Sequence, residues 1–244
     1  MAAAFDWPDF LDAFTRSAEK AGFACESILD TDAGPLLAWS RGGSQTKVYL
    51  SAGMHGDEPA GPLAILRLMD EGFFKPGIQW LLCPALNPTG LAQGTRENSE
   101  GIDLNRDYWL KRSAEARAHA AWLEKQALPD LFLSLHEDWE TSGFYFYEIN
   151  LGRDTPQRAA GIIDAVKPWF PPESGGEIDG HIPRAPGWIY HEAEADLPEG
   201  WPEAIFIAKL GCPLSFTFET PSHAALESRI AAHCAAVRAA CDGL

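Results

Sequence analysis

The sequence predicts an α/β protein with a mainly parallel sheet and helices on both faces. Strand-like apolar runs alternate with amphipathic helix patterns through the first two thirds of the chain, as parallel strands joined by helices require. The chain has 244 residues and is 46% hydrophobic, which is enough to bury one large core without disulfides. We therefore expect a single domain over residues 1–244.

The helices follow from apolar side chains at helical spacing. Glycines at positions 22 and 72 stand just after the first two patterns, where a helix commonly ends. The patterns predict helices at about 9–21, 59–71, 112–127, 155–167 and 222–241.

The strands follow from short apolar or alternating runs between turn residues. These runs cover 36–39, 47–52, 78–83, 131–135, 144–149 and 214–219. The segment 171–201 is rich in Pro, Gly, Glu and Asp, so we expect a long loop there. Such a loop serves either as a lid over a site or as a plain surface excursion.

Charge and composition exclude several classes of function. With 19 Lys and Arg against 35 Asp and Glu, the net charge is −16, which disfavours nucleic acid and anionic membranes as partners. No apolar run is long enough to span a bilayer, and the N-terminal residues show no secretory signal. The five cysteines are odd in number and have no CxxC spacing. They indicate reduced thiols in a cytoplasmic protein.

Two histidines and a glutamate stand at the ends of predicted strands. His55 and Glu58 follow the strand 47–52, and their three-residue spacing lets them converge at a helix entry. His136 directly follows the apolar run 131–135. Two imidazoles and a carboxylate form a three-ligand zinc set that leaves one position for water. The alternative is that His55 is a surface residue, that Glu58 caps a helix, and that His136 is a core histidine with its hydrogen bonds satisfied.

Further polar residues suit catalysis at such a metal. The strand 214–219 delivers Glu219 to its end, where a carboxylate that does not bind metal can accept a proton from water. Arg96 and Arg106 lie in a long polar stretch, and arginine binds carboxylates bidentately. The alternatives are that Glu219 is an ordinary glutamate before a turn and that the two arginines form structural salt bridges.

Together and in this order, the motifs HGDE, NPTG, TREN, GIDLNR, LH and FTFE resemble the M14 family of zinc carboxypeptidases, over residues 48–221. The short chain is most similar to the compact bacterial branch. That branch includes murein peptide amidases and the succinylglutamate desuccinylase and aspartoacylase group. The resemblance implies a zinc carboxypeptidase-like catalytic domain, with a mixed, twisted sheet of about eight strands flanked by helices on both faces.

The resemblance also implies a role for each matching residue. One Zn²⁺ is held by His55, Glu58 and His136, while Glu219 acts as general base and acid. The remaining roles fall to Arg96, which polarises the scissile carbonyl, and to Asn105 and Arg106, which grip the substrate carboxylate.

Some positions depart from the family pattern. The family tyrosine has no clear motif here, so Tyr190 is the candidate from the segment 171–201, with Tyr145 and Tyr147 as weaker ones. Glu137 and Asp138 follow the third ligand, where they could receive a substrate ammonium or orient a zinc ligand. The other histidines are interpreted as structural or surface residues: His119, His181, His191, His223 and His233.

The expected function is hydrolysis of an amide next to a free carboxylate, with murein-type peptides as one substrate class. An N-acyl-amino-acid deacylase on the same scaffold is the alternative, and a zinc-binding protein without turnover is less favoured. The expected partner is a small peptide or N-acyl amino acid. The sequence makes no prediction of the oligomeric state.

Overall fold

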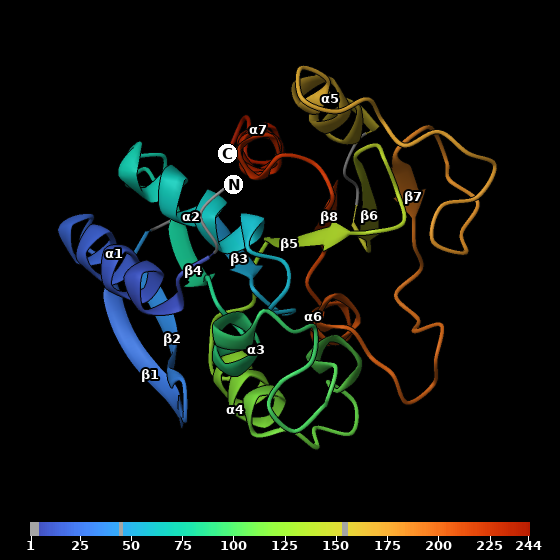
Figure 1. Cartoon of the computed structure of the whole chain (residues 1–244). Coiled ribbons are helices and arrows are strands. Elements are labelled where there is room, and N and C mark those ends of the chain that lie inside the picture. Colours follow the sequence, from blue (N-terminus) through green and yellow to red (C-terminus); the bar gives the residue numbers. More distant parts are fainter. Residues whose placement is uncertain (1–4, 44–45, 153–155) are drawn as a thin grey trace.

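The computed structural model describes residues 5–43, 46–152 and 156–244, and these form eight strands of one sheet and seven α-helices (Figure 1). The strands are β1 (Ala24–Thr31), β2 (Gly34–Arg41), β3 (Lys47–Ala52), β4 (Gln79–Cys83), β5 (Leu131–Asp138), β6 (Tyr145–Asn150), β7 (Trp188–Tyr190) and β8 (Leu214–Pro221). The helices are α1 (Trp7–Lys20), α2 (Ala60–Asp70), α3 (Pro88–Gln93), α4 (Ala114–Leu123), α5 (Pro156–Val166), α6 (Glu203–Leu210) and α7 (Leu226–Ala240).

The sheet is mixed, with the order β1-β2-β4-β3-β5-β8-β6-β7. Its four central strands, β4, β3, β5 and β8, run parallel, and β2 and β6 pair antiparallel to their two edges. The predicted α/β class and the mixed eight-stranded sheet are therefore confirmed. The carboxyl ends of β3, β5 and β8 meet at one edge, the place where such sheets collect ligands.

Side-chain alternation along the strands builds two cores on opposite faces of the sheet. On β3, Val48 and Leu50 belong to the core beneath α1, α2 and α7, whereas Tyr49 belongs to the core beneath α4 and α6. On β5, Leu133 and Phe132 divide in the same way. Figure 1 shows α2 and α7 on one side of the strands and α6 on the other. Helices on both faces thus follow from the apolar runs of the central strands.

Four elements were not expected from the sequence: β1, α3, β7 and α6. Strand β1 leaves most of its side chains exposed or half-buried, so it lacks the clear alternation of an edge strand packed on a core. The expected loop 171–201 is interrupted by β7, which pairs with β6 over three residues. Residues 1–4, where we expect no secretory signal, and residue 155, the expected start of a helix, lie outside the described residues.

Among the described residues, no helix combines the length and apolarity needed to cross a bilayer.

Candidate active site

The loop between β3 and α2 carries the first two candidate metal ligands, His55 and Glu58. Gly53 takes φ +64, which turns the chain sharply out of the strand. Gly56 then packs so closely on the backbone of Gly90 that a Cβ would lie 1.8 Å from its carbonyl carbon. The Gly56 N–H donates to the Thr95 carbonyl at 2.9 Å. The loop therefore reaches its position only because Gly53 allows the positive φ and Gly56 allows the close approach to Gly90.

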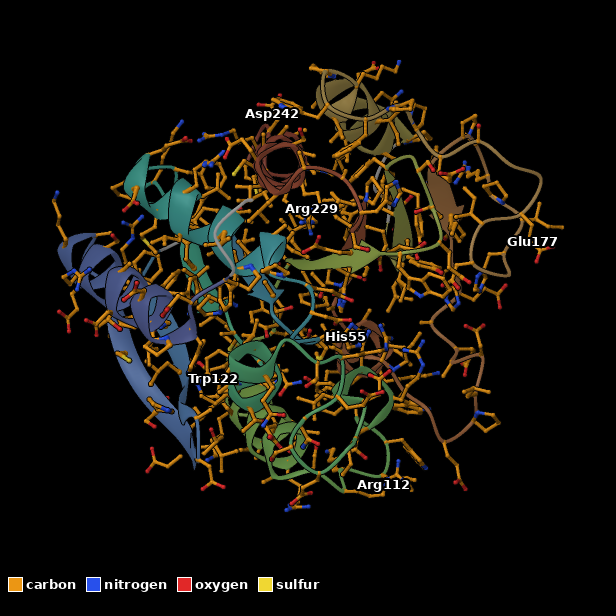
Figure 2. The ribbon with its side chains drawn as sticks, viewed as in Figure 1. His55, Arg112, Trp122, Glu177, Arg229 and Asp242 are labelled. Carbon is orange, nitrogen blue, oxygen red and sulfur yellow. The ribbon has the colours of Figure 1, made fainter. Side chains whose placement is uncertain are left out.

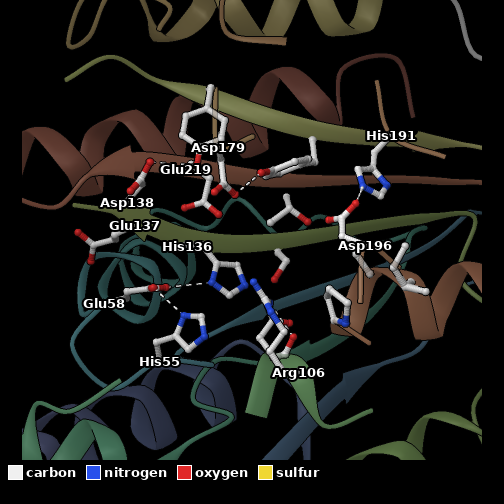
Figure 3. A pocket seen from close by; sticks show the side chains of 18 of the residues that line it. His55, Glu58, Arg106, His136, Glu137, Asp138, Asp179, His191, Asp196 and Glu219 are labelled. Carbon is white, nitrogen blue, oxygen red and sulfur yellow. Dashed lines mark hydrogen bonds and ion pairs between the residues drawn. The ribbon is translucent and has the colours of Figure 1, made fainter. Parts of the chain in front are cut away.

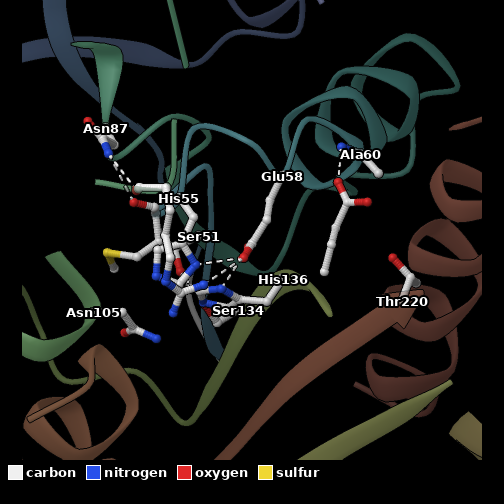
Figure 4. A network of polar contacts seen from close by, with 12 residues as sticks. Ser51, His55, Glu58, Ala60, Asn87, Asn105, Ser134, His136 and Thr220 are labelled. Atoms are coloured by element: carbon white, nitrogen blue, oxygen red, sulfur yellow. Dashed lines mark hydrogen bonds and ion pairs between the residues drawn. The ribbon is translucent and has the colours of Figure 1, made fainter. Parts of the chain in front are cut away.

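His55 and Glu58 from the loop and His136 from β5 converge onto one buried point (Figure 4). Glu58 Oε1 lies 2.7 Å from His55 Nδ1, and Glu58 Oε2 lies 3.0 Å from His136 Nδ1. All three side chains are at most 6% exposed. In Figure 2, His55 lies near the middle of the molecule, whereas Glu177 and Asp242 lie at its periphery.

Asp103 completes the setting of His55. Its Oδ1 lies 3.0 Å from His55 Nε2, and its Oδ2 accepts from Arg96 Nε at 3.2 Å. A carboxylate on the second ring nitrogen fixes the orientation of an imidazole and raises its basicity as a metal ligand. Arg96 also places a guanidinium nitrogen 3.6 Å from Glu58 Oε1.

The electrostatics of this cluster are dominated by the paired charges. Burial lowers the pKa of His55, but the Glu58 charge and the hydrogen bonds to Asp103 and Glu58 outweigh it and raise that pKa to about 9. Burial disfavours ionised Glu58 and Asp103 as well. The imidazoles of His55 and His136 nevertheless hold the pKa of Glu58 well below its usual range, and His55 and Arg96 do the same for Asp103.

The end of β5 sends adjacent residues to opposite faces. His136 points to the α6 face with Ser134, while Glu137 points to the α2 and α7 face. There Glu137 accepts from the Ala60 N–H at 2.7 Å and pairs with Arg229. Its side chain is fully buried, so Glu137 is positioned neither for a substrate ammonium nor for orienting a ligand. Burial, opposed by Arg229, raises the pKa of Glu137 to about 7.

Glu219 lies beside His136 in the register of β5 and β8, and opposite Tyr145 of β6. Burial raises the pKa of Glu219 well above its ordinary value, and the charges of Glu58 and Asp138 raise it further. Within the described part of the chain, no hydrogen bond reaches the Glu219 carboxylate. Its oxygens are therefore free to exchange a proton with a ligand in the cavity.

Asn105 and Arg106 reach the same cavity from the short 3₁₀ turn Leu104–Arg106. The Asn105 side-chain oxygen accepts from the Glu203 N–H at 3.1 Å, which leaves its amide NH₂ for a ligand. Arg106 donates to the Asn105 carbonyl at 2.9 Å. Among the described residues, its guanidinium forms no ion pair, so it can accept an anionic group.

Tyr190 is separated from the other predicted site residues. It lies on β7, is 44% exposed, and donates to the Asn150 carbonyl at 3.2 Å beside a different, smaller cavity. Tyr145 and Tyr147 line the main cavity instead, because alternation along β6 points both to the α6 face. Tyr145 donates to Asp138 at 3.1 Å, and Tyr147 donates to Asp179.

One cavity of about 550 Å³ joins these groups, and Figure 3 shows their side chains around it. Acidic groups outnumber cations in its wall, which includes Asp57, Asp138, Asp179, Asp196 and Glu219 against Arg96 and Arg106. Two buried imidazole nitrogens and a carboxylate within 4.8 Å of one another match the donor set of a catalytic zinc site.

Sequence reasoning gave no role to Asp103, Asp179 or Asp196. Asp103 stands two residues before Asn105 in the GIDLNR motif, so its nearness to the predicted site was a usable signal. The other two lie in the irregular segment around β7, whose path over the cavity is set by tertiary contacts. No local pattern could have identified them.

Comparison with known proteins identifies a family for this chain. Residues 44–167 match the model of the succinylglutamate desuccinylase/aspartoacylase catalytic domain. No curated protein sequence matches the chain.

Solved structures extend the similarity to nearly the whole chain. A candidate metallopeptidase from Shewanella amazonensis is 26% identical, with a TM-score of 0.84 over 97% of this chain and 92% of that one. A second, from Shewanella denitrificans, is 25% identical, with a TM-score of 0.82 over 97% and 90%. A metallo-carboxypeptidase from Pseudomonas aeruginosa shares the fold at 21% identity, with a TM-score of 0.61 over 92% of this chain and 67% of that one. The chain therefore belongs to the succinylglutamate desuccinylase/aspartoacylase catalytic-domain family and has the metallo-carboxypeptidase fold.

Proposed function

We propose that this protein is a zinc-dependent hydrolase that cleaves an amide bond next to a free carboxylate. One observation carries the proposal: the buried His55, Glu58 and His136 cluster shares a cavity with Glu219 and with the Arg106 guanidinium, which forms no ion pair among the described residues. A metal site, a proton acceptor and a carboxylate receptor in one cavity are the parts that this reaction needs.

His55, Glu58 and His136 would hold the ion, and Asp103 would orient His55 through its second nitrogen. When bound, zinc supplies a water whose pKa falls towards ~7 and a positive charge for the substrate carbonyl oxygen. Binding requires both imidazoles to be neutral, so the proton that His55 holds beside Glu58 and Asp103 must leave.

Glu219 is the group placed to move protons in the reaction. Its raised pKa brings it closer to neutral pH, where a carboxylate both accepts a proton from water and returns it to a leaving amine. Arg96, now beside Asp103 and Glu58, can turn its donors to the oxygen on which negative charge develops.

Arg106 and Asn105 align the substrate through its carboxylate. The Arg106 guanidinium and the free Asn105 amide NH₂ offer donors on the same side of the cavity. Fixing a carboxylate there converts binding energy into orientation of the amide. Because Arg96 is already paired with Asp103, the cavity provides for one substrate carboxylate rather than two.

The substrate should be neutral or cationic apart from that carboxylate. Asp138, Asp179 and Asp196 line the remaining wall and would repel a second anionic group. This favours a metallocarboxypeptidase activity on small peptides. Diaminopimelate-containing murein peptides are a suitable class, because the second carboxylate of diaminopimelate is neutralised by the ammonium on the same carbon. The family match favours a second candidate, an N-acyl-amino-acid deacylase, for which the same wall selects neutral acyl groups over succinyl groups.

The test is amine release from a matched panel, measured with zinc-loaded protein. The panel holds neutral dipeptides, diaminopimelate-terminated peptides, N-acetyl amino acids and N-succinyl amino acids. We expect chelator-sensitive cleavage of members with one carboxylate, and of diaminopimelate members, whose second carboxylate is balanced by the ammonium on the same carbon. Preference between the peptides and the N-acetyl members decides between the two candidates. Preference for N-succinyl members would contradict the proposed repulsion of a second anionic group by the acidic wall.

Arg106→Ala tests the carboxylate receptor. We expect kcat/KM to fall at least 100-fold for substrates with a free carboxylate and little for their amidated analogues, since a charged bidentate contact is lost only in the former. Arg112→Ala, on an exposed arginine that pairs with Asp107 outside the cavity, is the matched control. Equal losses on free and amidated substrates would remove Arg106 from this role.

A further inference from the structure

A second group of metal-binding side chains lies at another side of the same cavity. His181 lies in the loop between α5 and β7, His191 directly follows β7, and Asp196 lies in the segment leading to α6. Their ligand atoms lie within 4.8 Å of one another. Figure 3 shows His191 and Asp196 across the cavity from His55 and Glu58. We propose that His181, His191 and Asp196 form a second site for a divalent transition-metal ion such as Zn²⁺.

The spacing of the three ligand atoms suits coordination better than hydrogen bonding. Nε2 of His181 and Nε2 of His191 each lie 3.5 Å from Asp196 Oδ1. Hydrogen bonds of this kind are about 2.7–3.2 Å long. Two ligand atoms on a tetrahedral zinc, each bonded at about 2.0–2.2 Å, stand roughly 3.3–3.6 Å apart. Each imidazole is therefore already separated from the carboxylate as an ion between them requires.

Both imidazoles are held in the form that presents Nε2 to a metal. His181 Nδ1 lies 2.7 Å from the Asp179 carbonyl oxygen, and His191 Nδ1 contacts the Glu192 carbonyl oxygen. A carbonyl can only accept, so Nδ1 carries the hydrogen in each ring. In the neutral ring, the Nε2 lone pair then faces Asp196. Metal-binding histidines commonly use a backbone carbonyl in this way.

The backbone of both histidines is fixed by β-structure. Asp179 and Gly180 take φ of 45° and 75° in a two-residue turn, and across it Ile178 and His181 exchange two backbone hydrogen bonds of 2.9 Å. The His191 N–H donates to the Glu148 carbonyl of β6 at 2.8 Å.

Tyr147 of β6 supports both imidazole rings from the sheet. Its ring packs edge-on against those of His181 and His191, with centroids 5.4 and 5.9 Å away. Two of the three ligands are thus held in place before an ion arrives.

The second site does not depend on the proposed metal centre, because it shares no ligand with the His55 cluster. It differs in exposure: the Asp196 side chain is 68% exposed, whereas that of Glu58 is 6% exposed. An exposed ligand must be ordered when the ion binds, so we expect the second ion to bind more weakly and to be stripped first. When bound, it would join the loops on the two sides of β7 at the cavity wall.

The test is metal content after equilibrium dialysis of the full chain against Zn²⁺, measured by elemental analysis. We expect two ions per chain in the wild type, one in His191→Ala, one in His55→Ala, and none in the double variant. His223→Ala, which removes an exposed histidine outside both clusters, should keep two. Copper bound to His55→Ala should show an electron paramagnetic resonance spectrum with two imidazole nitrogens, and one after His181→Ala.

A second measurement follows the ordering of the segment 191–200, which carries His191 and Asp196. Zinc should protect the segment 191–200 from limited proteolysis in the wild type and in His55→Ala, but not in His191→Ala. One ion in the wild type with no change in His191→Ala would overturn the second site. A second ion that survives His191→Ala would place it elsewhere and overturn it equally. Loss of metal only in His55→Ala would leave the proposed function intact.

Discussion

Glu219 differs from Asp103 and Asp138 in the same cavity, because no hydrogen bond from the described residues reaches its carboxylate. Asp103 is held by His55 and Arg96, and Asp138 accepts from Tyr145. Glu219 instead lies beside His136 with its pKa raised by burial and by nearby acids. A residue held in this way can change its protonation state during a reaction without breaking a structural contact.

Glu219→Gln should therefore separate metal binding from turnover. We expect the variant to keep one zinc in the His55 cluster and to lose ~10²-fold or more in kcat, the usual contribution of a positioned general base. The measurement pairs metal content with single-turnover kinetics on the best member of the panel. Near-normal turnover would exclude Glu219 as the proton acceptor.

Asp103→Asn tests the residue behind the first ligand. Removing the charge weakens the bond that orients His55, so we expect zinc affinity to fall about 10–100-fold. Asp57→Asn is the matched control, because Asp57 lines the same cavity but makes no hydrogen bond to His55 among those of the described residues. Competition with a chromogenic chelator measures both. Similar losses in the two variants would point to general electrostatics rather than to orientation.

At the scale of elements, β5 serves two purposes with adjacent residues. His136 faces the cavity, and Glu137 crosses to the other face to accept from the first N–H of α2 and to pair with Arg229 of α7. Helix α2 has no side-chain cap of its own at Pro59. Glu137 replaces that cap from another element and ties β5, α2 and α7 together.

Glu137→Ala should reduce the free energy of unfolding by about 3–4 kcal/mol, because it leaves the mostly buried Arg229 guanidinium without its partner. Urea denaturation measures the change, with the exposed Glu140→Ala as control. Because the hydrogen bonds of the Glu137 carboxylate go to α2 and α7 rather than to His55, Glu58 or His136, the variant should still bind zinc at the His55 cluster when folded. An unchanged midpoint would show that the pair is not structural.

The elements that could be predicted from the sequence are those whose pattern of apolar side chains follows directly from which of their faces are buried. Strands β3 and β5 carry nearly continuous apolar runs because both faces are covered, whereas β8 alternates apolar and polar residues, and all three were expected. Strand β1 is mostly exposed, and β7 has three residues, so neither carries a pattern strong enough to identify it.

For the candidate site, strand ends indicated His55, His136 and Glu219, because the carboxyl ends of parallel strands share an edge. The positions of Tyr190 and Glu137 could not be predicted in the same way. Each depends on which face of its strand points to the cavity, and that is decided by the register of the whole sheet.

At the scale of the whole molecule, a buried polar network ties the sheet to α6. Glu203 at the start of α6 accepts from Tyr49 at 2.7 Å and from Ser51 at 2.8 Å. His119 lies between the hydroxyls of Tyr49 and Tyr108, at 2.8 and 2.6 Å. Burial raises the pKa of Glu203 to about 7 and lowers that of His119 to about 3, so the imidazole is neutral.

This network should make stability depend on pH. The Glu203 carboxyl has a pKa of about 7 when folded and ordinarily 4.5, so the folded protein holds the extra proton between these values. Stability is therefore lost as the pH rises from 4.5 through 7, by about 3 kcal/mol for this group. Glu203→Gln removes this titration. The free energy of unfolding of the variant, relative to that of the wild type, should therefore rise by about 3 kcal/mol as the pH goes from 5 to 8.

Urea denaturation of the variant and of the wild type, each at pH 5 and at pH 8, measures this rise. The exposed Glu97→Gln should show no such gain. A constant difference between Glu203→Gln and the wild type across this range would contradict the raised pKa.

The alternation of His136 and Glu137 along β5 also bears on how this protein can diverge. A single inserted or deleted residue in that strand would exchange a ligand for a helix cap and damage both faces at once. The loops around β7 carry no such constraint, because their length can change without shifting the central strands. Changes of length are therefore expected in these loops, whereas β5 must keep its register for His136 and Glu137 to stay on their own faces.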